Sequence, residues 1–600
     1  MTRKRKNVEN GDEGGTIPGY GYVGPKNEDP PLEDQSEQYE QWRSQQERRP
    51  FPNKNHRLGG APYGERASWN EKKSNFDQRQ DFQQFGRQEE RKYREFPKEV
   101  VSYLRKMEQL KKEQKLEDVM LETCAREIAG METQLLEFRE ACTVVENVFG
   151  SSASGAVLFL SALTRLKHKQ LLELLFTGTS ARTVEKLIFC MHPVASIEHV
   201  QVIAKFADLL CDNWKDTIFD QSASFVMRCI VRVVSGLGPR KNATLGFMLE
   251  EAEFTNNEVK AELKSIYEKI AQLAFDFKLN SGEENEMMVS FVLQGVANAE
   301  ANWKSGRVDE YVQNIVSKEH AAESIQKLWC GKNSSRFWEC IVAVCREETR
   351  SAIWMASLAD NFHFYCTHEF ANFPLQHFMI NATSFELANE IADGIFGQIP
   401  ELLANHREGV VRAALHCVAR HESLQEPILK QLRTVSNKTS FLYNVLTNNR
   451  YDGEVFDVEK STLQGSLLLA LLLRFTKTKT LSACIDIIPP ETVREMATNK
   501  TANHVIQEIF LSKTLDSETK TKVADSLQED WESVINTTYG SFVFEKVWEW
   551  YEVRKKIEVM QKLSQAKGST KFFKFAMLKC DLQLFRKNRV EWINKWKKKK

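Results

Sequence analysis

The chain has 600 residues, in which 82 lysines and arginines balance 82 aspartates and glutamates. This length exceeds what a single hydrophobic core supports, so we expect either several domains or one extended repeat array. The zero net charge excludes a global basic field that would draw the molecule onto nucleic acid or an anionic membrane, so any such site must be a local surface.

Targeting signals and cysteine spacing indicate the compartment of the protein and whether disulfides or zinc stabilise it. The first residues, MTRKRKN, lack the apolar core of a secretory signal, and the longest leucine-rich stretch, Leu467 to Leu473, is too short to cross a bilayer. We therefore expect a soluble, intracellular protein without a membrane partner. The twelve cysteines contain no CxxC pair, the closest two being Cys340 and Cys345. This spacing argues against a disulfide framework or zinc ribbon and predicts reduced, buried thiols.

Residues 1–95 form the first segment in chain order. They are rich in proline, glycine and charged residues, as in GYGYVGPKNEDPPLED, and few of them are apolar. A segment of this composition buries too little apolar surface to offset the entropy lost on folding. We expect a disordered, charged N-terminal arm.

Residues 96–590 carry apolar residues at helical spacing, which predicts an all-helical region. One short helical signature recurs there in eleven copies, the clearest being ANHVIQEIF from Ala502. Four intervals between neighbouring copies are 37 or 38 residues, as from Ser335 to Asn372 and from Asn503 to Ser541, and the longer gaps fit one repeat plus an inserted loop. A short helical hairpin of this length cannot bury its apolar face alone, so we expect the copies to stack into an all-α, curved α-solenoid.

The repeated helix has a polar side as well as an apolar one. In the copy from Ala502, Asn503, His504 and Gln507 cluster on one side of the helix, away from the apolar residues. Asparagine and glutamine one turn apart can both reach the edge of a single base, and the ring between them can stack on the base face. The pattern predicts one unstacked nucleotide per repeat, with both amide side chains facing solvent.

This pattern resembles the Pumilio (PUF) family, whose repeats each present such a triplet to one RNA base. The resemblance covers roughly residues 110 to 590. It implies two uracil readers, two guanine readers and one adenine reader. In that order, they are Asn503, His504, Gln507 and Asn372, Phe373, Gln376; Ser335, Arg336, Glu339 and Ser541, Phe542, Glu545; and Ser290, Phe291, Gln294. With the family's polarity, the RNA would spell G-U, a gap of two, then U-G-A.

Three copies depart from the family pattern. Two central copies have aliphatic groups where base-edge donors and acceptors are needed, so we expect them to read no base. These residues are Val410, Val411 and Ala414 in one copy and Ser466, Leu467 and Ala470 in the other. A third copy, with Ser224 and Phe225, ends its triplet in Arg228, a better partner for phosphate or guanine.

The array as a whole resembles one subfamily, the nucleolar Pumilio-like protein nine family. The features that carry this resemblance are the eleven copies with a silent middle, the basic start from Arg3 to Lys6, the final segment LKCDLQLFRKNRVEWINKW and the lysine run from Lys597 to Lys600. The resemblance implies a nuclear, nucleolar factor that binds single-stranded or partly structured pre-rRNA. It further implies control of cleavage near the 18S 3′ end, alongside small-subunit assembly factors.

Three other functions stay open. They are a cytoplasmic Pumilio-type regulator of mRNA, a nucleolar relative that binds duplex by charge alone, and a protein-binding scaffold of the HEAT or armadillo type. Polar residues on an exposed helix face are ordinary. Five triplets with the same residue types at the same offsets favour RNA binding, and closed terminal caps favour a monomer.

Catalytic and metal motifs are weak. His363, Cys366 and His368 lie close together without a second ligand pair, so a core or hinge role is expected, as for His416 and His421. There is no P-loop, HExxH or GxSxG pattern. We expect no enzyme activity, cofactor, metal or small-molecule substrate.

The last segment, residues 591–600, is expected to be a basic C-terminal tail. It could be a solvated end, a nuclear address or an RNA contact. Trp592 and Trp596 within it are expected to pack the last helix.

Overall fold

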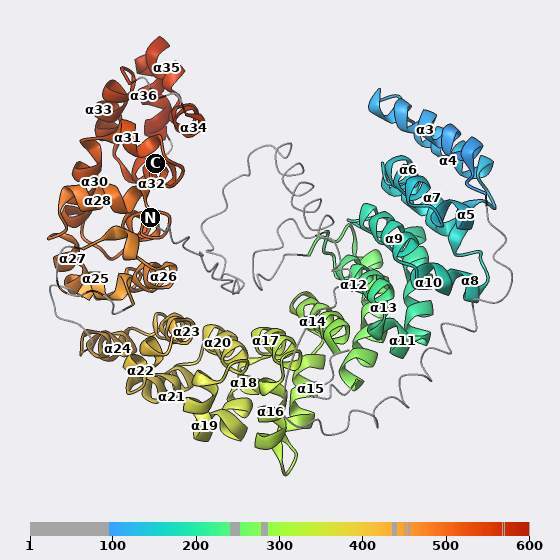
Figure 1. The fold of residues 1–600 in the computed structure, drawn as a ribbon, viewed down its shortest axis with the longest axis horizontal. Coiled ribbons are helices and arrows are strands. Elements are labelled where there is room, and N and C mark those ends of the chain that lie inside the picture. Colours follow the sequence, from blue (N-terminus) through green and yellow to red (C-terminus); the bar gives the residue numbers. More distant parts are fainter. Residues whose placement is uncertain are drawn as a thin grey trace, which may run out of the picture. The chain divides into compact units, whose positions relative to one another are not determined.

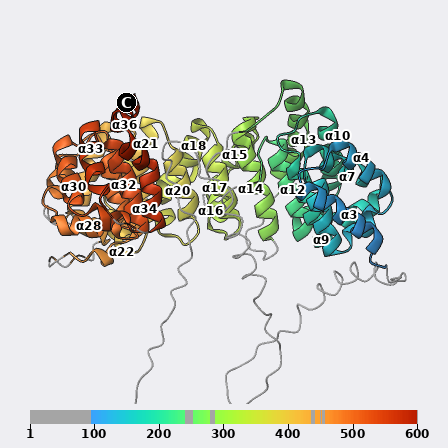
Figure 2. The same cartoon turned by 90° about the horizontal axis from the view of Figure 1, so that it is seen from above.

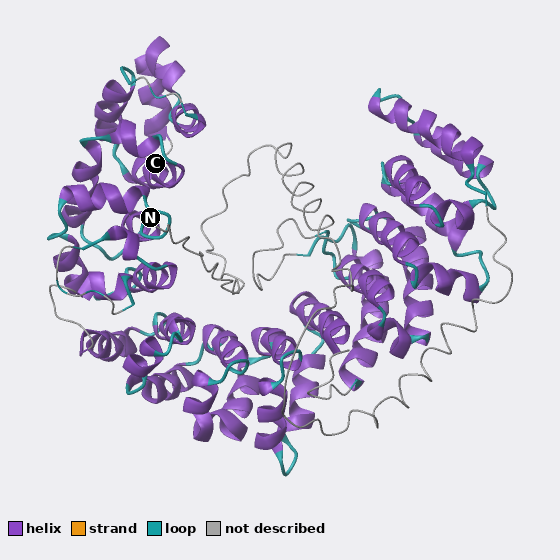
Figure 3. Cartoon of the chain, viewed as in Figure 1, coloured by secondary structure: helices purple, strands orange, loops and turns teal. Residues whose placement is uncertain are grey.

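The computed structural model describes residues 95–239, 252–277, 286–434, 441–448, 456–566 and 570–598, together with residues 451, 453 and 568. The chain has two compact units, one of residues 1–148 with 240–248 and the other of residues 149–239 with 249–600. The expected N-terminal arm lies outside the described residues, apart from Glu95. Every element in the described ranges is a helix (Figure 3), which confirms the all-α class.

The first unit supplies the first copy of the repeated signature. Its described helices are α3 (Lys98–Lys112), α4 (Asp118–Glu127), α5 (Glu132–Leu136) and α6 (Arg139–Phe149). Leu104 of α3 and Val145 of α6 are fully buried. The Lys111 ammonium also donates to the carbonyl of Asn147 at 2.9 Å. This contact ties the long first helix to the helix that carries the signature.

The second unit contains the other ten copies, each on its own helix. These inner helices are α9 (Gly178–Cys190), α12 (Gln221–Val234), α14 (Glu286–Trp303), α17 (Ser334–Val344), α20 (Asn372–Asn381), α23 (Glu408–Val418), α26 (Leu463–Leu472), α29 (Asn503–Leu511), α32 (Thr538–Trp550) and α34 (Lys571–Lys579). Each packs against the next, so this unit is a curved solenoid with the inner helices on its concave side (Figure 1). Seen from above, α14, α17 and α20 run side by side (Figure 2).

The remaining helices connect and cover the inner row. They are α7 (Ala153–Leu163), α8 (His168–Leu175), α10 (Ile197–Asp212), α11 (Trp214–Phe219), α13 (Asn257–Asp276), α15 (Arg307–Val316), α16 (Ala321–Cys330), α18 (Glu347–Ile353), η1 (Trp354–Leu358), α19 (Ala359–Thr367), α21 (Phe385–Phe396), α22 (Ile399–Ala404), α24 (Glu422–Thr434), α25 (Phe441–Leu446), η2 (Val458–Lys460), α27 (Lys479–Ile485), α28 (Pro490–Thr498), α30 (Ser517–Gln528), α31 (Trp531–Ile535), α33 (Val553–Leu563), α35 (Leu582–Lys587) and α36 (Arg589–Lys598). Most repeats thus have a third, short helix beyond the expected hairpin. No helix in these ranges is long and apolar enough to cross a membrane.

The core of the second unit runs continuously between the two rows of helices. Trp329 of α16, Trp338 of α17 and Tyr365 of α19 are fully buried, and the Trp329 ring lies 6.0 Å from Trp338 and 5.4 Å from Tyr365. Trp329 and Trp338 belong to one repeat, and Tyr365 belongs to the next. Burial therefore joins each repeat to the next, as expected for units that cannot close a core alone.

Two tryptophans of α36 pack against the C-terminal helices of the second unit. Trp592 and Trp596 of α36 are buried, which confirms their expected packing role. The Trp592 indole N–H donates to the carbonyl of Cys580 at 2.7 Å, and the Lys556 ammonium lies 4.7 Å from the Trp596 ring centroid. Most of the expected basic tail is therefore the described part of this helix, while residues 599 and 600 lie outside the described residues.

Candidate nucleic-acid interface

Several inner helices are held at their start by a capping group just before the triplet. The Thr537 hydroxyl accepts a hydrogen bond from the N–H of Gly540 at 3.0 Å, at the start of α32. In α20 the cap is an imidazole, because Nδ1 of His368 accepts from the N–H groups of Phe370 and Ala371, both at 3.1 Å. Such caps satisfy the orphan donors of the first turn. They fix where the helix begins and therefore where its triplet lies.

The first residue of each triplet is buried and bonded to backbone. The Asn503 amide group donates to the carbonyls of Asn499 and Lys500 at 2.8 and 2.9 Å, and the side chain is 1% exposed. Asn372 makes the same pair of bonds, and Ser541 donates to the carbonyl of Thr538 at 2.7 Å. The expectation that Asn503 faces solvent is therefore wrong. The amide N–H groups of Asn503 bond within the turn before α29. Its side-chain oxygen is left to accept hydrogen bonds from other groups.

The last residue of the triplet bonds back to the first where it is glutamine. Nε2 of Gln507 donates to Oδ1 of Asn503 at 2.7 Å, and Gln376 donates to Asn372 at 2.8 Å. Gln294 likewise donates to the hydroxyl of Ser290 at 2.9 Å. Gln376 is buried, whereas Gln507 and Gln294 are half-buried. Each pair is a preformed polar unit whose hydrogen bonds hold one side chain against the other.

The two glutamates at the last position have different surroundings. Glu545 pairs with Lys579 of the next inner helix, at 2.5 Å. Glu339 is 8% exposed and lies 3.8 Å from Nε2 of His377 on α20. Burial raises the pKa of Glu339 to about 8, while Arg336 lowers it to a smaller extent. Burial also lowers the pKa of His377 to about 4, so both groups are neutral near pH 7.

The middle residue of each triplet is exposed or half-buried and is never fully buried. Phe542 is 49% exposed and Arg336 is also exposed, whereas Phe291, Phe373 and His504 are half-buried. Flat groups that are exposed or half-buried therefore occupy equivalent positions on the inner helices of the five triplets. This arrangement offers a base a stacking face and a hydrogen-bonding edge at the same repeat.

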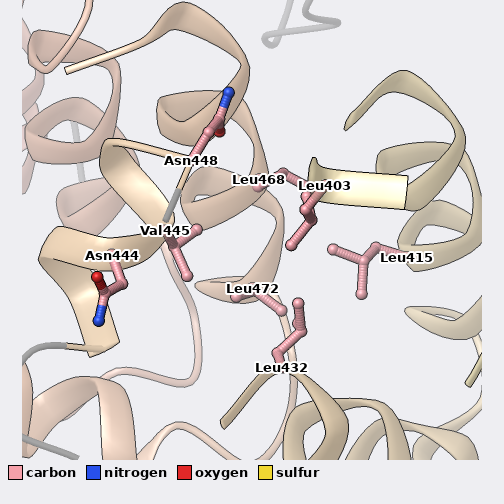
Figure 4. A pocket seen from close by; sticks show the side chains of 8 residues that line it. All are labelled: Leu403, Leu415, Leu432, Asn444, Val445, Asn448, Leu468 and Leu472. Atoms are coloured by element: carbon pink, nitrogen blue, oxygen red, sulfur yellow. The ribbon is translucent and has the colours of Figure 1, made fainter. Parts of the chain in front are cut away.

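The two central copies present no such unit. Val410, Val411 and Ala414 of α23 are fully buried, and Ser466 of α26 is too. Leucine side chains from α22, α23, α24 and α26 line a small, almost wholly apolar pocket beside them (Figure 4). All of the positions identified in the sequence except the half-buried Leu467 are thus core residues, because packing against neighbouring helices covers them.

Two other positions of α23, Gly409 and Arg412, lie against the neighbouring repeats. The repeat pattern in the sequence did not identify them. A Cβ at Gly409 would lie 2.7 Å from Oε1 of Gln376, and the Arg412 guanidinium donates to Oε1 of Gln464 at 3.1 Å. Burial first, and then the charges of nearby arginines including Arg412, lower the pKa of His416 to about 4. Gly409 and Arg412 are three residues apart and therefore share one face of α23. That spacing is the signal in the sequence that could have identified them.

The triplet of α12 also differs from the rest. The guanidinium carbon of Arg228 lies 4.1 Å from the ring centroid of Phe225 and 5.3 Å from that of Phe291 on α14. Ser224 is buried and donates to the carbonyl of Gln221 at 2.9 Å. Arg228 therefore lies between two of the projecting rings.

The histidines and cysteine considered as metal ligands have separate environments. Nδ1 of His363 is 3.1 Å from Oε1 of Gln398, and His368 caps α20. Cys366 is fully buried, and burial raises the pKa of its thiol to about 12. Within the described ranges, no three histidine, cysteine or acidic residues gather as a metal-ligand set.

A family model described as the NOP9-like PUF repeat domain matches residues 241–570, more than half of the chain. The chain belongs to the NOP9-like PUF repeat family. Its similarity to curated relatives is distant. Nucleolar protein 9 from Homo sapiens is 20% identical over 261 residues, which is 39% of this chain and 41% of that protein. Nucleolar protein 9 from Mus musculus is 21% identical over 389 residues, or 58% and 61%. The matched regions thus span less than two thirds of each relative.

Solved structures share the fold of this NOP9-like chain. The structure of APUM23-GGAAUUGACGG has a TM-score of 0.64 at 15% identity and covers 83% of this chain and 99% of its own. The structure of APUM23-GGAUUUGACGG gives the same TM-score and coverage at 16% identity. These likenesses agree with the curved solenoid of the second unit.

Proposed function

We propose that this chain binds single-stranded or partly structured pre-rRNA along its inner helices, with one base at each intact triplet. The observation that carries this proposal is the geometry shared by the triplets, in which a buried first residue is followed by a flat group that is exposed or half-buried. A base can stack on the flat group while its edge meets the polar atoms. Lysines and arginines elsewhere on the surface would hold phosphates, so affinity should fall as salt rises.

The base preferences proposed for each triplet are those that the resemblance to the PUF family implies. The pairs Asn503 with Gln507 and Asn372 with Gln376 are assigned to uracil. A carboxylate accepts hydrogen bonds and does not donate, which suits the N–H groups on the edge of guanine. Glu545, and Glu339 in its deprotonated form, are therefore assigned to guanine, and the Ser290 triplet to adenine.

The assigned triplets predict G-U, a gap of two, then U-G-A. The gap corresponds to α23 and α26, whose equivalent side chains are buried except for the half-buried, aliphatic Leu467. The sequence GGAAUUGACGG, which accompanies the structurally similar APUM23, contains U-G-A and is a suitable first probe for this chain. Selection of RNAs from a random pool tests the assignment without bias. A selected pool without enrichment of U-G-containing sequences would contradict it.

A single substitution sharpens this test. Gln294→Glu would convert the Ser-Phe-Gln triplet of α14 into the Ser-Phe-Glu triplet found on α32. We expect the selected base at that position to change from adenine to guanine. Gln313→Glu, which makes the same charge change at an exposed position of outer helix α15, is the matched control and should leave the selected sequence unchanged.

The cellular role proposed is nucleolar. The relatives are named nucleolar protein 9. We assign this chain to small-subunit biogenesis, where it would act as a monomer beside assembly factors and control cleavage near the 18S 3′ end. Crosslinking in cells followed by sequencing of the bound RNA tests this role. Reads across pre-rRNA near that end support it. Reads from mature mRNA would favour a cytoplasmic regulator, reads from duplex regions without base preference would favour binding by charge, and an absence of RNA would favour a protein scaffold.

A further inference from the structure

Arg228 occupies a position that no other triplet residue takes. Its guanidinium carbon lies 4.1 Å from the ring centroid of Phe225, one turn earlier on α12, and 5.3 Å from that of Phe291 on α14. Phe225 is 42% exposed, so the pair of rings lies at the surface of the inner row. The guanidinium at the end of this triplet therefore lies over two aromatic rings from neighbouring inner helices.

The two rings belong to equivalent positions of neighbouring repeats. Phe225 and Phe291 are the middle residues of consecutive triplets, as Arg336 and Phe373 are farther along the array. In the triplet of α14, Gln294 bonds to Ser290 instead of lying over a ring. The space between consecutive middle residues is where a base would stack when the array binds RNA. In the α12 repeat the protein's own guanidinium is in that space.

A guanidinium is a good substitute for a base in such a slot. It is planar, and it is attracted to the faces of aromatic rings. Stacking of an arginine on a ring and stacking of a base on a ring are stabilising by the same order of magnitude. A base that enters the slot must displace Arg228, so most of the stabilisation that it gains is offset by what the arginine loses.

We propose that Arg228 is a plug that closes a latent base slot between Phe225 and Phe291 and thereby sets one end of the bound RNA segment. This inference rests on the proposed function, because it concerns the length of RNA that the same surface holds. The ligand of the opened slot would be a single nucleobase, held by stacking on the two rings. The last stacked base of the bound RNA then lies on the other face of Phe291, away from Phe225.

Removal of the plug should lengthen the bound segment by one base. The probe is an RNA selected from a random pool on the full wild-type chain, compared with the same RNA extended at either end by one 2-aminopurine nucleotide, whose fluorescence falls when it stacks. Wild type should bind both lengths equally and leave the added base bright. Arg228→Ala should bind the longer RNA about tenfold more tightly than the shorter one and quench the added base, as expected for one stacked base.

Matched variants separate stacking from charge. Arg165→Ala removes an exposed arginine outside the inner row and should behave as wild type. Addition of Phe225→Ala to Arg228→Ala should abolish the gain, because one face of the slot is lost. If Arg228→Ala folds poorly, Arg228→Gln serves instead, since it creates the Ser-Phe-Gln triplet of α14 and should make the gain largest for adenine at the added position.

The outcomes distinguish the two proposals. If wild type binds no RNA above background, the proposed function fails and this inference fails with it. If wild type binds RNA but neither variant gains from the extension, the plug alone is overturned. A loss of more than tenfold for the original RNA in Arg228→Ala also overturns it, because Arg228 would then be contacting phosphate or guanine directly.

Discussion

Asn503 and Gln507 should have separable effects on folding and on RNA binding, although both belong to one triplet. Asn503 is 1% exposed and takes part in three side-chain hydrogen bonds, two donated to backbone carbonyls and one accepted from Gln507. At about 0.5–1.5 kcal/mol net per bond, Asn503→Ala should destabilise α29 by about 2–4 kcal/mol. Gln507→Ala breaks one half-buried bond and should cost about 1 kcal/mol.

Hydrogen exchange of the α29 amides is the suitable assay. In a stacked-repeat protein each repeat opens with its neighbours, so a global unfolding curve would average the effect away. A change of about 2–4 kcal/mol corresponds to amide exchange about 30-fold to 1000-fold faster. Gln507→Ala should raise exchange by about tenfold or less. Asn389→Ala on outer helix α21, whose amide bonds only to Asp393 among the bonds described, is the control and should leave α29 exchange unchanged.

Binding of the selected RNA completes the comparison. Gln507→Ala should weaken affinity by about 1–3 kcal/mol while α29 stays folded, since it removes a base-edge contact. Equal exchange rates in Asn503→Ala and Gln507→Ala would refute the reasoning, because they would mean that the buried carbonyl contacts of Asn503 add nothing to the stability of the helix.

Further predictions concern Glu339 and two glycines. Because the pKa of Glu339 is about 8 and guanine binding needs its carboxylate, affinity for the selected RNA should rise about tenfold per pH unit up to about pH 8 and then level off, a dependence absent in Glu339→Gln. The raised pKa also means that folding stability from this group falls as pH rises from about 4.5 to about 8. Gly409→Ala would place a Cβ 2.7 Å from Oε1 of Gln376, so α20 exchange should rise by roughly tenfold as that side chain shifts. Gly540→Ala would drive a Cβ into the Val534 carbonyl, so exchange in α32 should rise by about tenfold to 100-fold, corresponding to about 1–3 kcal/mol.

Local periodicity explains what could be predicted of the fold. The spacing of apolar residues and the interval between copies of the signature depend on residues within one repeat, so they predicted helices and their stacking correctly. The bond from Gln507 to Asn503 is also local, since residues four apart meet on one helix face. The short additional helices were not predicted, because their few residues carry too little periodicity to distinguish them from loops.

The amino-acid sequence by itself determined that this chain is a helical repeat array, and it predicted which residues of each repeat would meet a base. The tertiary structure alone decided the burial of Asn503, the neutral contact of Glu339 with His377 and the position of Arg228 between Phe225 and Phe291. The reason is physical. Burial and stacking depend on side chains contributed by neighbouring repeats, and Phe291 is 63 residues from Arg228 along the chain. A helical period describes which residues share a face, and the adjoining helix decides what that face contacts.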